Sequence, residues 1–269
     1  MSASIHPSAF VAPGAELGND VSVGPCAVIE DNVVIGDGCE IHAFASVKQY
    51  TKMGRGNVIH SYALVGGTPQ DLKFAGEVSA LEIGDNNQIR EFASLHRGTE
   101  GGGGVTRIGS NNLIMAYCHV AHDCILGDSI VMSNGATLAG HIEVFDHAII
   151  GGLSAIHQFS RVGRHAFVGG MTGISQDLPP YMMAVGGRAG IHGPNLVGLR
   201  RLRLPSSSVT AIRAAFRLIW HSDMPRQEAL EKALEEFPDV PEVREIVEFV
   251  RSSPRGVLHA VKTSDVKDD

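Results

Sequence analysis

The chain has 269 residues, with 29 acidic side chains against 22 lysines and arginines, a formal net charge of −7 and an isoelectric point near 6.0. This negative balance argues against a general nucleic-acid binder, whose surface is usually basic. The start of the chain has no basic stretch followed by an apolar run, and no run of about 18 apolar residues occurs, so we expect neither a secretory signal nor a membrane span. Four cysteines without paired spacing predict a reducing compartment, the cytoplasm.

An aliphatic residue recurs every six positions through the first two-thirds of the chain. The series is Ile5, Val11, Leu17, Val23, Ile29, Ile35, Ile41, Val47, Met53, Ile59, then Ile83, Ile89, Leu95, and then Ile108, Ile114, Val120, Leu126, Met132, Leu138, Val144, Ile150, Ile156, Val162, Val168, Ile174. Neither a helix nor an ordinary strand has this period, but a short strand followed by a tight turn does. Three such units close a triangle, and the coils then stack as parallel strands ~4.8 Å apart. The sequence therefore predicts an all-β solenoid, a parallel β-helix of hexapeptide repeats with about eight coils.

Two segments interrupt this period. Residues 65–82 carry Gly, Pro and charged side chains, and residues 96–107 contain four consecutive glycines. Both are predicted to be loops extruded from the solenoid, where functional residues are common. Three cysteines, Cys39, Cys118 and Cys124, occupy the fifth position of their hexads, and we interpret them as small buried side chains.

A second, helical part follows the solenoid. We place a β-helix domain at 1–190 and a small α-helical domain at 191–269. Three apolar stripes at helical spacing predict core-facing helices. They comprise Val209, Ile212, Phe216 and Ile219; Leu230, Ala233, Leu234 and Phe237; and Val243, Ile246, Val247 and Val250. Asp239 with Glu242 predicts a capping box at the start of the third helix, and the tail after Arg255 is expected to be loose.

The coil geometry gathers several of the 13 histidines. Residues 18 apart in an unbroken run lie directly above one another, so His141 lies above Asp123, and His122 lies one coil below position 140. By the same count His157 lies above position 139, one coil higher at this corner. These four residues are therefore expected at one corner of three successive coils, within roughly 10 Å along the axis.

Two further histidines are placed near this corner. His119 lies at the same turn, and His96 falls one coil lower if the glycine loop contains about seven inserted residues. A histidine beside a carboxylate is the usual arrangement of a general base, because the carboxylate orients the ring and stabilises its charged form. Zinc binding is the competing interpretation, since a catalytic zinc site requires three histidine or cysteine ligands and an open position. The placement of Asp123 and the lack of a widely spaced histidine pair, as in hexapeptide carbonic anhydrases, favour the base and predict no metal.

Six short segments extend these observations to a known family. They are QDLKFAGE (70–77), LHRGT (95–99), HVAHDC (119–124), LAGH (138–141), IHQF (156–159) and QDLPPY (176–181). Together they resemble the UDP-N-acetylglucosamine 3-O-acyltransferase family of lipid A biosynthesis, over nearly the whole chain. The resemblance implies a left-handed coil, a homotrimer without a cofactor, and active sites in clefts between adjacent coils. It also implies transfer of a long 3-hydroxyacyl group from acyl carrier protein to the 3-hydroxyl of UDP-N-acetylglucosamine.

The resemblance also implies roles for individual residues. His122 matches the catalytic base, Asp123 the residue that orients it, and Gly140 the glycine whose N–H serves as oxyanion donor. The residues that match substrate contacts of the family are Asp71, Lys73, His119, His141, His157, Gln158, Asn195 and Arg201. The coil geometry adds His96 to this set. Gly170 matches the position at the far end of the acyl groove. A diphosphate on the acceptor would account for the basic run at residues 199–204.

Departures from the family pattern fall in the region matched to the nucleotide. The family commonly has an acidic residue where this chain has Val197, and a basic pair followed by Gly-Phe where this chain has Arg201, Leu202 and Arg203. Arg203 is a candidate to replace the lost contact.

Other activities stay open at this point. They are the N-acyltransferase of the same pathway, which carries an additional N-terminal domain, a metal-dependent hydratase and a non-catalytic scaffold. A plain scaffold gives no reason for the histidines to converge. The acyl length, and whether the acceptor presents a hydroxyl or an amine, do not follow from the sequence.

Overall fold

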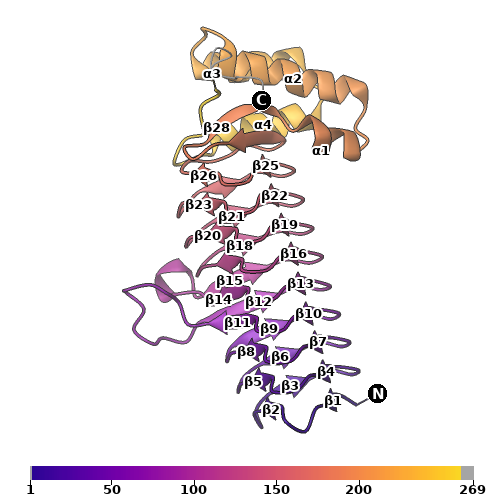
Figure 1. The fold of residues 1–269 in the computed structure, drawn as a ribbon. Coiled ribbons are helices and arrows are strands. Elements are labelled where there is room, and N and C mark those ends of the chain that lie inside the picture. Colours follow the sequence, from indigo (N-terminus) through magenta and orange to yellow (C-terminus); the bar gives the residue numbers. More distant parts are fainter. Residues whose placement is uncertain (1, 262–269) are drawn as a thin grey trace.

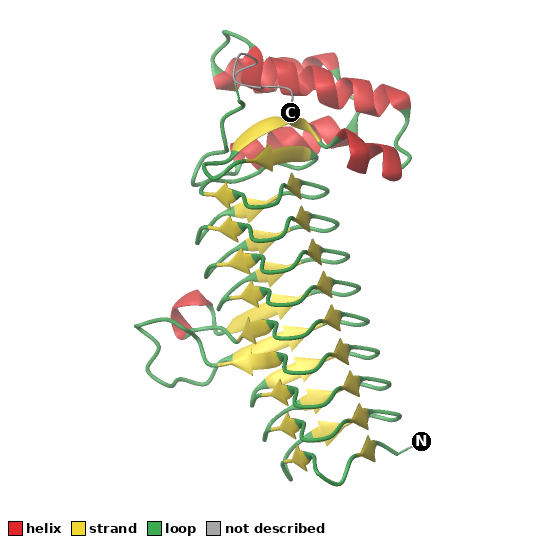
Figure 2. Ribbon diagram, viewed as in Figure 1, coloured by secondary structure: helices red, strands yellow, loops and turns green. Residues whose placement is uncertain are grey.

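The computed structural model describes residues 2–261, and it is a left-handed parallel β-helix with helices at its C-terminal end. Figure 1 shows the coils stacked into a column, with one pair of extruded loops halfway along and the helices across the far end. Figure 2 shows that short strands separated by tight turns make up the column. The strands form three sheets, here called sheets A, B and C, and each coil contributes one strand to each sheet.

Sheet A contains β1 (Ser4–Ile5), β4 (Ser22–Val23), β7 (Glu40–Ile41), β10 (Val58–Ile59), β13 (Gln88–Ile89), β16 (Leu113–Ile114), β19 (Val131–Met132), β22 (Ile149–Ile150), β25 (Phe167–Val168), β27 (Met182–Val185) and β28 (Gly190–Pro194). Sheet B contains β2 (Phe10–Val11), β5 (Val28–Ile29), β8 (Ser46–Val47), β11 (Leu64–Gly67), β14 (Ser94–His96), β17 (His119–Val120), β20 (Thr137–Leu138), β23 (Ala155–Ile156) and β26 (Gly173–Ile174). Sheet C contains β3 (Glu16–Leu17), β6 (Val34–Ile35), β9 (Thr51–Met53), β12 (Ala80–Ile83), β15 (Val105–Ile108), β18 (Ile125–Leu126), β21 (Glu143–Val144) and β24 (Arg161–Val162).

The strand register confirms the predicted coil. In the unbroken run His119 pairs with Thr137, and Thr137 pairs with Ala155, so each coil contains three repeats, 18 residues, as predicted. Across the glycine loop, Ser94 pairs with His119, 25 residues on. This distance exceeds that of a regular coil by seven residues, the number of inserted residues expected for the glycine loop. His96 therefore lies one coil below the turn after β17.

The extruded loops are narrower than predicted, because pairing extends into both segments. Strands β11 and β12 leave residues 68–79 outside the solenoid, and β14 and β15 leave 97–104 outside, with a short 3₁₀ turn at Glu100–Gly102. The expectation of loops across 65–82 and 96–107 was therefore too wide, since β-pairing satisfies backbone groups that a loop would leave open.

The core runs inside the prism. The aliphatic residues of the hexads from Val23 to Ile174 are buried, whereas Ile5 in the first coil is 46% exposed. Cys39, Cys118 and Cys124 are fully buried at the corners. Burial raises the pKa of Cys118 to about 11 and that of Cys124 to about 12, so both thiols are neutral. The interpretation of these cysteines as small buried side chains is confirmed.

Four helices close the C-terminal end: α1 (Leu196–Arg201), α2 (Ser206–His221), α3 (Arg226–Glu236) and α4 (Pro241–Arg251). The predicted apolar stripes face the core, with Ile212, Leu230 and Ile246 buried. None of the helices within residues 2–261 is long and apolar enough to cross a membrane.

Two details of the helical part differ from expectation. The cap of α4 is Val240, followed by Pro241, and no side chain caps it, so the predicted Asp239–Glu242 capping box is wrong; proline at the first position already lacks the N–H that a cap would satisfy. The chain after Arg255 is packed as far as it is described, because Val257 bridges to Asp177. The rest of the tail, 262–269, lies outside the described residues.

The predicted division at 190/191 falls at the start of β28. This strand pairs antiparallel with β27 and extends sheet A, and the helices begin at Leu196. Backbone pairing thus carries sheet A a few residues beyond the predicted division.

Candidate active site

His122 and Asp123 lie at the corner where the chain passes from sheet B to sheet C, here called the B–C corner. The Nδ1 of His122 lies 2.7 Å from Oδ2 of Asp123. The Asp123 side chain is fully buried, whereas 12% of the His122 side chain remains exposed. Because Nδ1–H donates to the carboxylate, the Nε2 of neutral His122 is left as a proton acceptor.

The glycine loop holds the Asp123 carboxylate. The backbone N–H of Thr99 donates to Oδ1 at 2.8 Å, and its hydroxyl donates to Oδ2 at 2.7 Å. The N–H of Asp123 in turn donates to the hydroxyl of Thr106 at 2.8 Å. Gly102 packs so closely over the carboxylate that a Cβ there would overlap it. Sequence reasoning missed Thr99, although the residue lies in the motif LHRGT.

The next coil supplies His141 and Gly140. The Nε2 of His141 lies 3.8 Å from Oδ2 of Asp123, and its ring meets the His122 ring edge-on at 5.1 Å while stacking on Phe159 at 4.6 Å. Gly140 passes directly over His122, since a Cβ at position 140 would come within 2.6 Å of the His122 ring. The N–H of Gly140 donates to no acceptor within residues 2–261, which leaves it available beside the base.

His96, from one coil below, and His119, from the same coil as His122, complete this group. Their rings meet edge-on at 4.9 Å, and Nδ1 of His119 lies 2.8 Å from the hydroxyl of Ser94. Burial, with the nearby His119 and His122, lowers the pKa of His96 to about 4. Burial and His122 lower the pKa of His119 as well. Both rings are therefore neutral near pH 7, which avoids repulsion when His122 takes up a proton.

Four other predicted contacts, His157, Gln158, Asp71 and Lys73, are not joined to this group by any interaction described within residues 2–261. His157 occupies the same corner one coil above His141, but it is exposed and its Nδ1 lies 3.0 Å from the backbone oxygen of Gln158. Asp71 and Lys73 lie on the loop 68–79, where the N–H of Lys73 donates to the Asp71 carboxylate. None of the hydrogen bonds or ion pairs described for residues 2–261 connects Asp71 or Lys73 to the histidines.

His122, Asp123 and His141 also form the one group of this kind in the described chain that offers metal-ligand atoms within 4.8 Å of one another. Both oxygens of Asp123 already accept hydrogen bonds from protein donors. That arrangement suits a carboxylate that orients a histidine.

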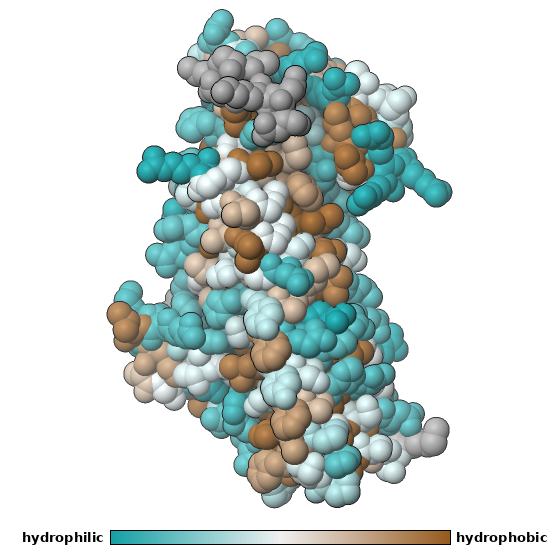
Figure 3. All heavy atoms as spheres, in the orientation of Figure 1, coloured by the Kyte–Doolittle hydropathy of each residue, from teal (hydrophilic) through white to brown (hydrophobic). Residues whose placement is uncertain are grey.

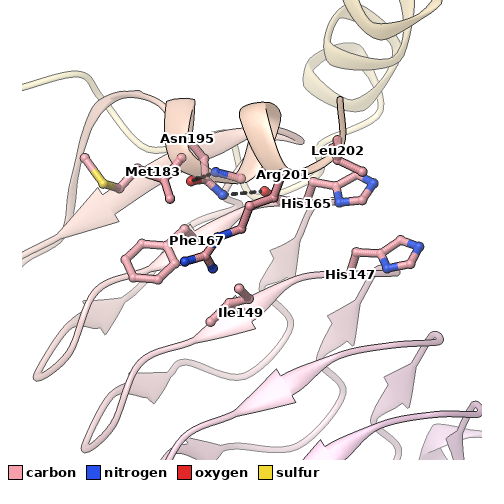
Figure 4. A pocket seen from close by; sticks show the side chains of 10 residues that line it. His147, Ile149, His165, Phe167, Met183, Asn195, Arg201 and Leu202 are labelled. Carbon is pink, nitrogen blue, oxygen red and sulfur yellow. Dashed lines mark hydrogen bonds between the residues drawn. The ribbon is translucent and has the colours of Figure 1, made fainter. Parts of the chain in front are cut away.

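Asn195 and Arg201 line a separate pocket of about 460 Å³. Figure 4 shows the Arg201 side chain reaching past Asn195 toward Phe167, with His147 and His165 at one side. Both polar atoms of the Asn195 side-chain amide form hydrogen bonds with the backbone. Nδ2 donates to the backbone oxygen of His165 at 3.1 Å, and Oδ1 accepts from the N–H of Gly198 and so caps α1. Arg201 is the pocket's one arginine among the described residues.

The departures noted in the sequence fall inside this pocket. Val197 and Leu202 both line it, so apolar side chains stand where the family pattern carries charge. Arg203 does not line this pocket. His147 and His165, stacked at 4.5 Å, are polar groups of this pocket that sequence reasoning missed.

The structure places the histidine group, the pocket and Gly170 at different corners. The histidine group lies at the B–C corner, whereas His147 and His165 lie where the chain passes from sheet C to sheet A. Gly170 precedes β26 at the corner between sheets A and B. Gly170 and His122 therefore lie at opposite ends of the strands of sheet B, and the strands they adjoin, β26 and β17, are three positions apart in that sheet.

Comparison with known proteins agrees with this architecture. A family model described as UDP N-acetylglucosamine O-acyltransferase, domain 2, matches residues 177–258, and one described as bacterial transferase hexapeptide repeats matches residues 106–140. The acyl-[acyl-carrier-protein]–UDP-N-acetylglucosamine O-acyltransferase of Anaeromyxobacter sp. (strain K) is 50% identical over 254 residues, which cover 94% of this chain and 99% of that protein. The enzyme of the same name from Aliarcobacter butzleri is 48% identical over 254 residues, 94% of this chain and 97% of that protein.

Solved structures give the same result. The UDP-N-acetylglucosamine acyltransferase from Bacteroides fragilis matches with a TM-score of 0.93 and 41% identity, covering 95% of this chain and all of that one (100%). The Arabidopsis enzyme matches with a TM-score of 0.83 and 37% identity, covering 94% and 99%. These similarities extend over solenoid and helices together, and the chain therefore belongs to the family of acyl-[acyl-carrier-protein]–UDP-N-acetylglucosamine O-acyltransferases.

Proposed function

We propose that this protein transfers a 3-hydroxyacyl group from acyl carrier protein to the 3-hydroxyl of UDP-N-acetylglucosamine, with His122 as general base. The reaction would be the first step of lipid A biosynthesis and would take place in the cytoplasm. The observation that carries the proposal is the His122–Asp123 pair, with a fully buried carboxylate on Nδ1 and a partly exposed ring.

The chemistry follows from this pair. A sugar hydroxyl is a poor nucleophile at neutral pH, so His122 Nε2 takes its proton as the oxygen attacks the thioester carbonyl. Asp123 stabilises the imidazolium that forms. The N–H of Gly140 is positioned to donate to the developing oxyanion. When the carbon–sulfur bond breaks, the imidazolium returns the proton to the leaving thiolate, and the new ester bond remains on the sugar.

The separation of the corners supports a homotrimer. A single chain presents the base at the B–C corner and the pocket of Asn195 and Arg201 at the C–A corner, so one chain alone does not bring them together. A second copy placed against the B–C corner would complete the site with its own pocket. Substrate contacts by Asp71, Lys73, His157 and Gln158 are proposed on the same basis, since no interaction described within residues 2–261 joins these side chains to His122.

A mass-resolved assay tests the proposal. Purified protein would be given UDP-N-acetylglucosamine and acyl carrier protein charged with several 3-hydroxyacyl lengths, and a 3-amino analogue of the sugar would be run in parallel. His122→Ala is expected to lower turnover by a factor of about 10²–10⁴, the usual cost of removing a general base. His6→Ala, at an exposed histidine of the first coil, is the control. Near-normal turnover by the His122 variant would exclude it as the base.

A metal-dependent activity is the second candidate, because His122, Asp123 and His141 offer ligand atoms close together. The metal content of the purified protein, and its activity after treatment with a chelator, distinguish the two. Acyl transfer by His122 requires no metal and should survive the chelator.

A further inference from the structure

Arg97 directly follows His96 in the segment LHRGT, yet it takes no part in the site described so far. The residue is only 7% exposed, and its Nε has no hydrogen-bond partner within residues 2–261. It also forms no ion pair in this part of the chain, although arginines are rarely buried without one. Five other arginines, along the solenoid and at its junction with the helices, do pair with carboxylates: Arg55–Asp85, Arg90–Glu91, Arg107–Glu82, Arg161–Asp177 and Arg164–Glu245.

Two aromatic rings take the place of a carboxylate beside Arg97. Its guanidinium carbon lies 5.6 Å from the centroid of the Tyr50 ring and 5.8 Å from that of the Phe74 ring. Its Nη1 donates to the backbone oxygen of Gln49 at 3.4 Å. The face of an aromatic ring attracts a cation, and it does so more strongly where water is excluded. The planar guanidinium group is suited to stacking on such rings, so these contacts stabilise the buried charge.

The two rings belong to different parts of the molecule. Tyr50 precedes β9, and its backbone oxygen accepts from the N–H of Leu81 at 3.1 Å, so it is fixed in the solenoid. Phe74 lies on the extruded loop 68–79. Figure 3 shows the extruded loops projecting from the side of the column, with hydrophilic and hydrophobic side chains on their surface. Arg97 therefore connects a projecting loop to the stacked coils.

Phe74 also closes the turn that carries two proposed substrate contacts. Its N–H donates to the backbone oxygen of Asp71 at 3.0 Å, and the N–H of Lys73 donates to Oδ1 of Asp71 at 3.0 Å. These two bonds fix the shape of the turn but not its position relative to the coils. The contact between Phe74 and Arg97 supplies that position.

We propose that Arg97 is a positioning residue, which holds the turn Asp71–Phe74 against the solenoid before the UDP-sugar binds. The proposal rests on the proposed function, which assigns Asp71 and Lys73 as substrate contacts. Because Arg97 directly follows His96, a member of the histidine group, the turn is held beside the catalytic corner. A loop that is fixed before binding loses less conformational entropy on binding, and this raises the affinity for the acceptor.

The first test is a double-mutant cycle. Arg97→Met keeps a long unbranched side chain but removes the charge, and Phe74→Leu keeps an apolar side chain but removes the ring. Each should raise the Michaelis constant for the UDP-sugar about tenfold, as expected for the loss of a buried cation–π contact, and leave kcat nearly unchanged. The double variant should match Arg97→Met, because both substitutions remove the same contact. Phe74→Tyr retains the ring and should behave as the wild type.

The second test follows the loop without the reaction. A lysine-specific protease cuts after Lys73 when the turn opens, so the free protein should be cut there about tenfold faster in Arg97→Met and Phe74→Leu than in the wild type. Arg107→Met is the matched control, because Arg107 lies on β15, is exposed and pairs with Glu82. It should match the wild type in both the cleavage rate and the Michaelis constant.

The outcomes separate this proposal from the proposed function. Phe74 lies on the extruded loop, so Phe74→Leu tests the contact even if Arg97→Met unfolds the coil. An unchanged Michaelis constant in the folded variants, an unchanged cleavage rate, or additive effects in the cycle would each overturn the role of Arg97. Absence of acyl transfer by the wild type would instead overturn the proposed function, and the cleavage rates would still decide whether Arg97 holds the turn.

Discussion

Thr99 binds both carboxylate oxygens of Asp123, one through its backbone N–H at 2.8 Å and the other through its hydroxyl at 2.7 Å. The glycine loop that carries Thr99 therefore does more than connect two strands. It fixes the direction in which Oδ2 meets Nδ1 of His122, and its donors stabilise the ionised form of a carboxylate that is shielded from water.

Thr99→Val should lower kcat by about 10- to 100-fold, because a hydrogen bond to a charged group contributes about 1.5–3 kcal/mol. The Michaelis constants should change little, since Thr99 acts on Asp123 and is itself buried. Thr99→Ser retains the hydroxyl and should recover most of the rate. A loss in the Ser variant with little loss in the Val variant would show that the methyl group, and not the hydroxyl, is what matters.

Gly102→Ala and Gly101→Ala form a matched pair in the same loop. A Cβ at Gly102 would overlap the Asp123 carboxylate, whereas a Cβ at Gly101 would meet nothing within 4 Å. We expect the first substitution to displace the loop and reduce kcat at least as strongly as Thr99→Val, and the second to have little effect. Turnover is measured for both variants, together with thermal unfolding; similar values for the pair would contradict the close packing on Asp123.

The contrast between Asp123 and Thr99 shows how far the sequence alone can lead. A strict period places every residue of the solenoid relative to its neighbours, so the shared corner of His122, Asp123 and His141 was predictable. Thr99 lies in a segment without a period, and its position depends on how the loop folds back over the corner. Arg201 and Asn195 also lie outside the periodic region. The period therefore could not place them relative to the base, and only the structure shows that they are separate from it.

Stability should decrease as the pH falls below about 6.5, partly through His165. Burial, with His147 and Arg164 nearby, lowers the pKa of His165 to about 4, so the unfolded chain binds a proton more readily than the folded protein between these values. The contribution is fully present above pH 6.5 and is lost as the pH falls toward 4. Between pH 7 and pH 5 it amounts to at most about 2 kcal/mol.

His165→Phe tests this contribution. Phe keeps the stacking on His147 and Tyr181 but does not bind a proton. The variant should lose less stability than the wild type between pH 7 and pH 5, as measured by denaturant unfolding at each pH. Parallel curves for the two proteins would assign the acid sensitivity to other groups, including His96.

Arg201→Ala should raise the Michaelis constant for the UDP-sugar about tenfold, with a smaller difference at high salt, because an exposed phosphate contact is screened. Arg203→Ala is the control, since Arg203 is exposed and does not line the pocket. If both variants lose stability and neither changes the Michaelis constant, the arginines of this run cover helix surface and do not contact the nucleotide.

Gly170 should limit the length of the acyl chain. Between His122 and Gly170, the outward positions of sheet B carry small side chains on successive strands, Thr137, Ala155 and Gly173. They leave a shallow diagonal path across the sheet, with an axial rise of about 14 Å over three strand spacings. An acyl chain that starts at the base would follow this path and end at Gly170.

Gly170→Met tests this limit cleanly, because the backbone at position 170 does not require glycine. Its φ lies outside the left-handed region, and a Cβ would meet only the Gly152 carbonyl oxygen, at 3.5 Å. The substitution should therefore leave the fold intact and shift preference toward shorter 3-hydroxyacyl donors. Gly152→Met, one coil nearer the base at the same corner, should shorten the preferred chain further. The measurement is the ranking of kcat/KM across donor lengths, and an unchanged ranking in a folded Gly170 variant would mean that the chain takes another path.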